Sequence, residues 1–517
     1  MILVTAEQMR EMDRLTIQKY GTPSLMLMEH AGTGVVKAML DRFAEPASKG
    51  VLVVAGKGNN GGDGFVVGRL LREQGVCCEV ALLAKRNEIS SDSAHNLEAY
   101  SRAGGTVADI AADRLALLED SIAGKGMLVD AILGTGTKSE IRGMYADAIR
   151  AMNQSGLPIV AVDIPSGLDA DKGTPLGVCI RAAMTIALGY PKLGQVIHPG
   201  VEYVGHLVVA DIGIEPAALS EVAPSAELLT LEQVRPLVPV RKPDSHKGTY
   251  GHVLVIAGSR GKTGAAILAS RACMRAGAGL TTLAAPRSLN DIFAGAMIEV
   301  MTEPLRETTD EEIECLTDDE WRGLLERKTV ALFGPGIGVT DCTRNNLRWL
   351  LRHLDTPWVI DADGLNNLAL DIERLRTART APILTPHPGE MARLIGKDAR
   401  ELNKDRIGVA RAFATEHRCY LVLKGARTVL ATPDGKVSIN PTGNPGMASG
   451  GMGDVLAGIL AALLGQGLSP EAAMKLAVYL HGFVADRISA ERGMLGMIAS
   501  DIIDGLPTGY RSLTAAL

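Results

Sequence analysis

Short apolar runs alternate with longer amphipathic stretches along the chain, and this alternation predicts most of its secondary structure. In the first half the runs cover 51–55, 76–83, 127–130 and 158–163, and each follows a glycine or begins at a proline. Apolar runs of this length, rich in β-branched residues, are typical of buried strands in a parallel sheet.

Helical patterns fill the segments between these runs. A helix is predicted to start at Thr5, whose hydroxyl can cap it, and its apolar face carries Met9, Met12, Leu15 and Ile17. Another helix is predicted over 65–74.

The second half repeats the alternation. Strands are predicted at 251–258, 330–333, 358–361, 382–385 and 420–424. Helices are predicted over 263–275, 453–464 and 470–487, the last two being the final helices of the chain.

The pattern weakens between 215 and 245, where five prolines fall close together. We therefore place a domain junction near 215–230, which gives domains over 1–220 and 226–517. Strands that alternate with helices predict parallel sheets covered on both faces. The expected fold class is α/β, with two three-layer αβα domains.

Composition narrows the function classes. The 517 residues carry a net charge of −6 and no strongly basic stretch, which argues against nucleic acid as the main ligand. The seven cysteines form no CxxC pair, so we expect reduced, small core residues in a reducing compartment. The early charges of the N-terminus do not suit a signal peptide, and no apolar run approaches the roughly 20 residues that span a bilayer. A cytoplasmic protein without membrane contact is expected.

The segment 56–64 (GKGNNGGDG) is a glycine-rich turn between a predicted strand and a predicted helix. Glycines let the backbone approach a ligand, and a helix N-terminus offers free N–H groups to an anion. The spacing is not the Rossmann G-x-G-x-x-G fingerprint, and its Asn and Asp oxygens also suit a hard cation. The structural alternative is a turn with an Asn/Asp cap.

Two further strand ends carry aspartates. Asp130 precedes the glycine-rich turn 134–137, and Asp163 precedes Pro165, Ser166 and Gly167. In open α/β sheets, ligands bind beyond the carboxyl ends of the strands, so Asn60, Asp130 and Ser166 could surround one cation. Taken singly, each aspartate is more often a cap or a turn former.

The segments 59–64 (NNGGDG), 129–136 (VDAILGTG) and 162–169 (VDIPSGLD) together resemble the NAD(P)H-hydrate epimerase domain over about residues 1–215. The resemblance implies a Rossmann-like domain that interconverts the R and S forms of hydrated NADH and NADPH (NADHX and NADPHX). It implies potassium held by Asn60, Asp130 and Ser166, and Asp163 as the catalytic proton-transfer residue. The implied substrate-binding residues are Asn59, Asn60, Gly61, Gly62, Asp63, Gly134, Thr135, Gly136, Thr137, Lys138, Ser139, Glu140, Tyr145 and Asp163.

The strongest feature of the second half is 444–454 (NPGMASGGMGD), which leads into a helix. Small residues leave backbone N–H groups open at the helix start, as an anion hole for a phosphoryl group requires. Asp454 is placed to take a proton from an attacking hydroxyl. The structural alternative is an ordinary helix start whose first-turn aspartate favours the helix dipole.

Other turns carry weaker signals. The cationic turn 424–428 could meet nucleotide phosphates, and the carboxylates of Asp361 and Asp363 could recruit magnesium. His387, in a turn fixed by two prolines, is equally a ligand contact or a turn residue. The segment 258–263 contains Gly-Lys-Thr but is no Walker A loop, because Ile256 occupies the position of its first glycine.

Six segments in order (257–266, 333–338, 361–366, 385–390, 423–426 and 450–454) resemble the NAD(P)H-hydrate dehydratase domain of the ribokinase-like fold, over about residues 226–517. The resemblance implies dehydration of the S-hydrate driven by ADP with Mg²⁺, yielding AMP and phosphate, and Asp454 as the catalytic residue. The implied hydrate-binding residues are Ala265, Gly338, His387 and Asp454. The implied nucleotide-binding residues are Lys424, Gly425, Ala426, Arg427, Thr428 and Gly453.

The leading interpretation is thus a fused epimerase and dehydratase that repairs NADHX and NADPHX and forms a homo-oligomer. One alternative is a small-molecule kinase with a regulatory N-terminal domain. Another is a first half that serves as a non-catalytic binding module, since fold alone does not set function. The preference between the two hydrates, and between ADP and ATP, stays open.

Overall fold

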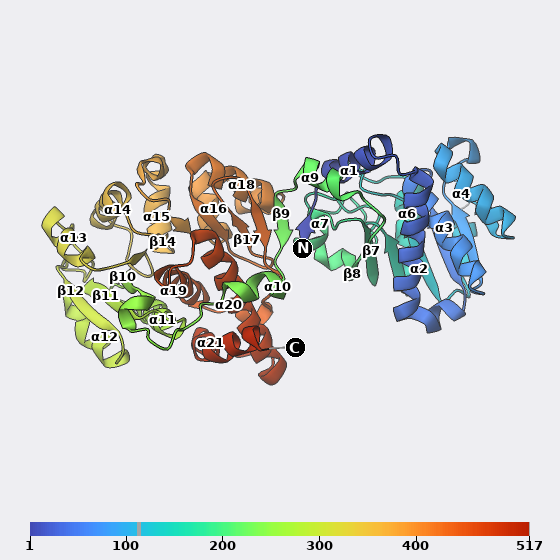
Figure 1. Ribbon diagram of the computed structural model, residues 1–517. Helices are drawn as coiled ribbons and strands as arrows, with labels where there is room; N and C mark the ends of the chain where they lie inside the picture. Colours follow the sequence, from blue (N-terminus) through green and yellow to red (C-terminus); the bar gives the residue numbers. More distant parts are fainter. Residues whose placement is uncertain (111–114, 516–517) are drawn as a thin grey trace. The chain divides into compact units, whose positions relative to one another are not determined.

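The computed structural model describes residues 1–110 and 115–515 and divides into two compact units (Figure 1). One unit comprises residues 2–226. The other comprises residues 227–517 together with Met1. Among the described residues no helix is long and apolar enough to cross a membrane.

The N-terminal unit is built on a parallel sheet in the order β4-β3-β2-β5-β6-β7-β8. The strands of this unit are β1 (Ile2–Leu3), β2 (Val51–Ala55), β3 (Cys78–Leu82), β4 (Thr106–Asp109), β5 (Met127–Ala131), β6 (Ile159–Val162), β7 (Met184–Leu188) and β8 (His206–Ala210). The run at 51–55 has the predicted bounds, because all five of its side chains are buried.

Helices cover both faces of this sheet, as the alternation of side chains along β2 requires. Val51, Val53 and Ala55 pack with α1–α4, whereas Leu52 and Val54 pack with α5 and α6. The helices are α1 (Ala6–Gln18), α2 (Ser24–Ser48), α3 (Asn59–Glu73), η1 (Arg86–Glu88), α4 (Ser91–Arg102), α5 (Leu115–Ile122), α6 (Met144–Gln154), α7 (Leu193–Val196), α8 (Val201–Val204) and α9 (Pro216–Val222). Thr5 caps α1 as predicted, in a capping box with Gln8.

The C-terminal unit has strands in the order β9-β18-β17-β16-β15-β14-β13-β10-β11-β12. Pairing is parallel from β12 to β16 and antiparallel between β16, β17 and β18. These strands are β9 (Ala226–Leu228), β10 (His252–Ile256), β11 (Leu280–Pro286), β12 (Met301–Leu305), β13 (Val330–Phe333), β14 (Trp358–Ile360), β15 (Ile383–Leu384), β16 (Tyr420–Leu423), β17 (Val429–Ala431) and β18 (Val437–Ile439).

Two helical layers enclose this second sheet (Figure 1). One layer contains α11, α12 and α19–α21, and the other contains α13–α16 and α18. The helices are α10 (Leu231–Val234), η2 (Arg235–Leu237), η3 (Lys247–Tyr250), α11 (Thr263–Arg275), η4 (Arg287–Leu289), α12 (Asn290–Ala296), α13 (Asp318–Leu325), α14 (Asp341–His353), α15 (Asp363–Ala369), η5 (Ile372–Thr377), α16 (Pro388–Ile395), α17 (Ala399–Leu402), α18 (Arg406–His417), η6 (Pro445–Met447), α19 (Met452–Gly465), α20 (Pro470–Arg492) and α21 (Ala499–Thr514). The predicted pair of three-layer αβα folds is confirmed.

Each sheet has one point where the strand order reverses direction. In the N-terminal unit the chain moves outward in opposite directions from β2 and β5, and in the C-terminal unit from β10 and β13. The connections that leave neighbouring strands diverge there, which opens a crevice at the carboxyl ends. The first candidate site lies at such a point, and the second lies to one side of the other, where Asp361 and Lys424 follow β14 and β16.

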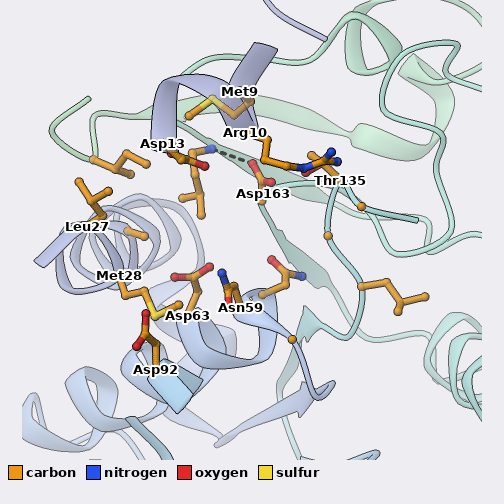
Figure 2. Close-up of a pocket in the computed structure, with 18 of the residues that line it drawn as sticks. Met9, Arg10, Asp13, Leu27, Met28, Asn59, Asp63, Asp92, Thr135 and Asp163 are labelled. Atoms are coloured by element: carbon orange, nitrogen blue, oxygen red, sulfur yellow. Dashed lines mark hydrogen bonds between the residues drawn. The ribbon is translucent and has the colours of Figure 1, made fainter. Parts of the chain in front are cut away.

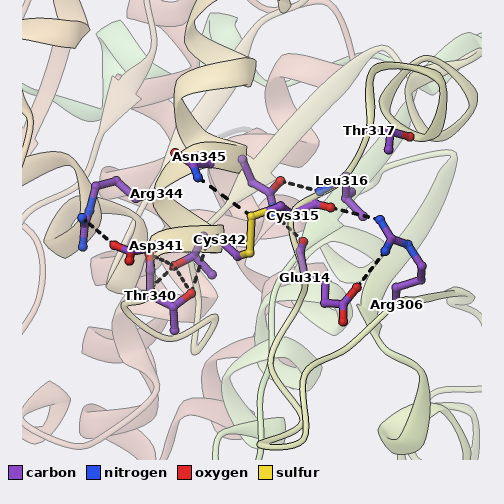
Figure 3. The surroundings of a disulfide bond; sticks show 12 residues. Arg306, Glu314, Cys315, Leu316, Thr317, Thr340, Asp341, Cys342, Arg344 and Asn345 are labelled. Atoms are coloured by element: carbon purple, nitrogen blue, oxygen red, sulfur yellow. Dashed lines mark hydrogen bonds and ion pairs between the residues drawn. A yellow bond between two sulfur atoms is a disulfide. The ribbon is translucent and has the colours of Figure 1, made fainter.

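Three sequence predictions were wrong. The glycine-rich segment 59–64 is not a loop, because it forms the first turns of α3. Helix α20 is not the last, since α21 follows it despite Gly505, Pro507 and Gly509. The cysteines are not all reduced core residues, because Cys315 and Cys342 form a disulfide between the segment before α13 and the start of α14 (Figure 3).

Candidate active sites

A cavity of about 650 Å³ lies at the carboxyl ends of β2, β5 and β6 (Figure 2). Its wall is formed by α1, α2, the first turns of α3 and the loops that follow these strands. Predicted site residues that line it are Asn59, Asn60, Asp63, Gly134, Thr135, Gly136, Thr137, Tyr145 and Asp163.

The glycines of α3 serve close packing beneath this cavity. The N–H of Gly56 donates to Ala131 O at 3.0 Å, which ties the end of β2 to β5. A Cβ on Gly61 would collide with Gly56 O, and a Cβ on Gly64 would lie 2.6 Å from the Cβ of Ala131. Without side chains there, the helix start descends onto the sheet and places Asn59, Asn60 and Asp63 at the cavity.

The remaining predicted substrate residues are not among those that line the cavity. Gly61 and Gly62 lie in the packed turn, and Glu140 forms a surface ion pair with Arg142 at 2.6 Å. Lys138 and Ser139 follow Thr137 in the same loop.

Asp163 directly follows β6 in a strained backbone conformation, with φ +65°. Its carboxylate accepts hydrogen bonds from the ammonium of Lys192 and from the N–H of Leu188 at 3.1 Å. The side chain of Gln195 donates to Asp163 O at 2.6 Å. A left-handed aspartate held from this many directions is typical of a functional site.

Lys192 was missed by the sequence analysis. It is 0% exposed, and its ammonium also donates to Leu188 O at 3.1 Å. A lysine is almost never fully buried unless it is paired. A lysine that directly follows a proline, four residues after the end of β7, could have signalled this role.

Asp13, on α1, was also missed and lines the same cavity. Burial raises its pKa to about 6, against the lowering effect of Lys192, and the charge of Asp163 raises it further. Burial likewise raises the pKa of Asp63 well above its ordinary value, with added repulsion from Asp163 and Asp13. The carboxyl groups of Asp13, Asp63 and Asp163 are therefore all subject to the positive charge of Lys192.

The predicted potassium ligands pass a simple chemical test. Both side-chain polar atoms of Asn60 are buried without a hydrogen-bond partner among the described residues. Asp130 is wholly buried, and its oxygens accept bonds from Ser166 N at 2.7 Å and Ser166 Oγ at 2.5 Å. Burial raises the pKa of Asp130 to about 6; hydrogen bonds from Ser166 and Ile132 oppose this, but no cationic side chain in the described part of the chain does. An unused amide oxygen beside an uncompensated carboxyl fits a hard cation.

The second candidate site lies at the N-terminus of α19. Gly451 adopts φ +89°, so the chain turns sharply into the helix and leaves the backbone N–H groups of its first turn free. Residues 448–450, just before this turn, are exposed. Such a helix start suits a phosphoryl group.

Charged side chains converge beside this helix start. The ammonium of Lys424 donates to Asp361 Oδ1 at 2.8 Å and lies 3.9 Å from Glu390. A Cβ on Gly453 would come within 3.0 Å of the same ammonium. Burial raises the pKa of Asp454 to about 7, with Asp361 raising it further and Lys424 lowering it. Asp454 can therefore exchange a proton near neutral pH.

The other predicted dehydratase residues lie on the loops around this cluster. Gly338 N donates to Asp363 at 3.0 Å, and a Cβ on Gly336 would lie 3.2 Å from the Cβ of Ala265. His387 is half exposed, and its Nδ1 accepts from Gly389 N at 2.9 Å, so it caps α16. Both roles left open for His387 stay compatible with this position.

The turn 424–428 is held from behind by Arg406, a residue that the sequence analysis missed. The Arg406 guanidinium donates to Ala426 O at 2.7 Å, Lys424 O at 3.3 Å and Leu423 O at 3.4 Å. Arg406 is buried, and burial alone lowers its pKa to about 10, because no carboxylate of the residues that the structure describes compensates it.

The side chains present do not form a magnesium site by themselves. Asp361 is occupied by Lys424, and Asp363 by Lys262 at 2.8 Å. In the part of the chain that the structure describes, no group of three or more acidic, His or Cys side chains is arranged to hold a metal.

Comparison with known families divides the chain in the same way. Residues 24–194 match the family described as YjeF-related protein N-terminus. Residues 253–508 match the family described as NAD(P)H-hydrate dehydratase.

Relatives match over nearly the full length. The bifunctional NAD(P)H-hydrate repair enzyme Nnr of Moorella thermoacetica is 44% identical over 99% of this chain and 97% of its own. The protein of the same name from Escherichia coli is 35% identical over 97% of this chain and 92% of its own. A crystal structure of ADP/ATP-dependent NAD(P)H-hydrate dehydratase from Bacillus subtilis, co-crystallised with ATP/Mg²⁺, is 31% identical. It covers 56% of this chain and 98% of its own, with a TM-score of 0.48.

Proposed function

The chain belongs to the family of bifunctional NAD(P)H-hydrate repair enzymes. From this premise we propose which of the two reactions each site catalyses. The protein is an NAD(P)H-hydrate epimerase and an ADP-dependent NAD(P)H-hydrate dehydratase. The epimerase interconverts the R and S hydrates, and the dehydratase returns the S-hydrate to NADH or NADPH. Fusion is useful because hydration without an enzyme yields both epimers.

The N-terminal cavity is the proposed epimerase site, and Asp163 is the observation that supports it. Its carboxylate is fixed beside the ammonium of Lys192 at a cavity large enough for a nicotinamide ring and its ribose. Held in this pairing, the Asp163 carboxylate is positioned to transfer a proton beside the hydroxyl-bearing carbon. The lining residues Asn59, Asn60, Asp63, Tyr145 and the 134–137 loop would bind the hydrate.

Potassium is proposed at Asn60, Asp130 and Ser166. The unpartnered Asn60 oxygen and the buried Asp130 carboxyl support this assignment. The ion would supply a positive charge beside these residues. Ser166 itself holds the 132–134 loop, because Leu133 N donates to Ser166 Oγ at 2.8 Å. Gly61, Gly62, Lys138, Ser139 and Glu140 stay predictions from the resemblance.

The helix start at 450–454 is the proposed centre of the dehydratase. We infer that Asp454 takes the proton of the hydrate hydroxyl while that oxygen attacks the terminal phosphorus of ADP and AMP leaves. The C–O bond then breaks, phosphate departs with the former hydroxyl oxygen, and loss of a neighbouring proton restores the double bond. Ala265, Gly338 and His387 would bind the hydrate. Gly453 and the Lys424–Thr428 turn would bind the nucleotide, and Mg²⁺ would enter on the phosphates of ADP.

The direct experiment supplies separated R and S hydrates with and without ADP and follows the absorbance of regenerated NADH. The proposal expects the S-hydrate to be consumed only with ADP, and the R-hydrate to follow through epimerisation. A stable phosphorylated product would instead identify a small-molecule kinase. R-hydrate that never converts would identify the first half as a non-catalytic module. Hydrate labelled with heavy oxygen in its hydroxyl group tests the phosphorylation step. The proposal of this step is wrong if the released phosphate carries no label.

Homo-oligomeric assembly and a cytoplasmic location stay predictions from the sequence.

A further inference from the structure

Asp13 is a carboxyl group without a structural task. It lies on α1, whose buried face is formed by Met9, Met12, Leu15 and Thr16. It lines the cavity on the side of Asp163 (Figure 2). Burial and the charges of Lys192 and Asp163 set its pKa, and among the described residues no hydrogen bond contributes. Burying such a group without a partner is costly, so a role in the cavity is the better explanation for its position.

The epimerase chemistry requires more than one proton-transfer group. The enamine double bond of a dihydronicotinamide takes a proton at its β carbon, so water adds to the carbon bonded to the ring nitrogen. Inverting that carbon requires its C–O bond to break and re-form on the opposite face. An acid must protonate the departing hydroxyl, and a base must then accept a proton from the water that returns.

Asp163 can supply only one of these two functions at a time. Its carboxylate accepts a hydrogen bond from the buried ammonium of Lys192, an arrangement that suits the base. The acid must therefore come from another group of the same cavity. The charged side chains that line it are Arg10, Asp13, Lys57, Asp63, Asp92, Asp163 and Lys192.

We propose that Asp13 is the second acid–base residue of the epimerase, paired with Asp163 across the ammonium of Lys192. Protonated Asp13 gives its proton to the hydroxyl, which leaves as water while the ring nitrogen supplies the electron pair of a C=N bond. Water then adds to the other face, and Asp163 accepts its proton. One C–O bond breaks and one forms, one proton is given and one is taken, and nothing is oxidised. In the opposite direction the two carboxyls exchange roles.

The electrostatics of the cluster agree with this division. Asp13 is partly buried at the cavity and feels the charge of Asp163 but makes no hydrogen bond with Lys192, so its acid form is populated at a higher pH than that of an ordinary aspartate. Two neighbouring carboxyl groups can take different roles when their surroundings give them different pKa values. The group with the higher pKa then serves as the acid and the other as the base.

The inference rests on the proposed epimerase function, and its test keeps the two apart. Asp13→Asn is assayed for R-to-S conversion in the full chain, with ADP-dependent dehydration of the S-hydrate as the folding control. We expect conversion to fall about 100-fold or more, with less than a threefold change in KM and unchanged dehydration. Glu11→Gln is the matched control, because it removes the same charge from the same helix at an exposed position paired with Arg14, and it should keep full activity.

Two readouts separate proton transfer from a structural role. Asp13→Glu should recover part of the rate. In the wild type, kcat/KM for epimerisation should decline as pH rises through about 6, where Asp13 loses its proton. This alkaline limb of the pH–rate profile should be absent in Asp13→Asn. An Asp13→Asn variant with more than half the wild-type rate, or with the same limb, would overturn the role of Asp13. A wild type that interconverts no epimers would contradict the epimerase proposal itself.

Discussion

The buried ammonium of Lys192 donates a hydrogen bond to the carboxylate of Asp163 across 29 residues of sequence. The pair joins the end of β6 to Lys192 at the start of α7, and Gln195 of the same helix donates to the Asp163 backbone. An ion pair in which one partner is fully buried sets both the charge of the carboxylate and its direction. Several predictions about the first site depend on this contact.

Replacing Asp163 with Ala or Asn should abolish epimerisation and spare dehydration. The expected loss in kcat is about 100- to 10,000-fold, because a positioned acid–base group contributes on this scale. The assay is R-to-S conversion, and dehydration of the S-hydrate by the same preparation controls for folding. Unchanged R-to-S conversion in these variants would remove the catalytic role.

Lys192→Met should destabilise the N-terminal unit alone. Removing one partner of a buried pair leaves an uncompensated charge and costs about 3–5 kcal/mol. All three tryptophans lie in the C-terminal unit, so their fluorescence reports that unit while circular dichroism reports both. We expect the urea transition to move to lower concentration by circular dichroism and to stay in place by fluorescence.

The control for this variant is Lys172→Met, which removes an exposed lysine from the same unit. It should shift neither transition. If Lys192→Met unfolded at the same urea concentration as the wild type, the ion pair between Lys192 and Asp163 would not stabilise the N-terminal unit.

Much of this architecture follows from local pattern, and the remainder depends on contacts between distant segments. β2 and α11 have the predicted bounds, because a buried apolar run and an alanine-rich helical pattern are local signals. The start of α3 was misplaced because glycine usually marks a loop. Here it permits contact with the backbone of Gly56, which no local pattern reveals. Pro507 likewise argues against a helix when the sequence is considered locally. Helix α21 forms nevertheless, because burial of Ile502, Ile503 and Leu506 outweighs the cost of the proline.

The same distinction applies to the candidate sites. Asn60, Asp130 and Asp163 were predicted together because parallel strands present their carboxyl ends at one edge. Lys192, Asp13 and Arg406 could not be predicted in this way, since each acts through a partner that only the topology brings near. The Cys315–Cys342 disulfide was missed for a similar reason, because its 27-residue separation matches no motif.

Potassium should stabilise the N-terminal unit as well as support epimerisation. A ligand that binds only the folded state raises its unfolding midpoint with concentration. Replacing K⁺ by tetramethylammonium should lower both the R-to-S rate and the midpoint seen by circular dichroism. In Asn60→Leu, which removes the unpartnered amide, neither quantity should respond to K⁺. A wild type that is indifferent to the cation in both measurements would contradict the potassium site.

Dehydration should depend on the ionisation of Asp454. A general base must be ionised, and burial raises the pKa of this carboxyl to about 7. Activity is therefore lost as pH falls through about 7, and kcat/KM at pH 6 should be roughly a tenth of its plateau at high pH. Asp454→Asn should lower the rate and flatten this limb, while epimerisation in the same chain continues. A wild-type profile without an inflection between pH 6 and 8 would argue against Asp454 as the base.

Arg406 should control the affinity for the nucleotide without touching it. Its guanidinium donates to the carbonyl groups of 423, 424 and 426 and so fixes the turn that we propose to bind the nucleotide phosphates. Its buried positive charge lies directly behind them, with no carboxylate to cancel it. Arg406→Met removes both effects, and we expect the KM for ADP to rise roughly 10- to 100-fold, the scale of a lost hydrogen bond to a charged group. The KM for the S-hydrate and the epimerase rate should stay near wild type, and Arg406→Lys should recover part of the affinity.

The matched control is Arg400→Met, which replaces an exposed arginine on the neighbouring α17. This variant should bind ADP normally by calorimetry. If Arg406→Met instead lowers kcat with an unchanged KM for ADP, the turn does not hold the nucleotide, and its assignment would have to move to the helix start at Gly453 alone.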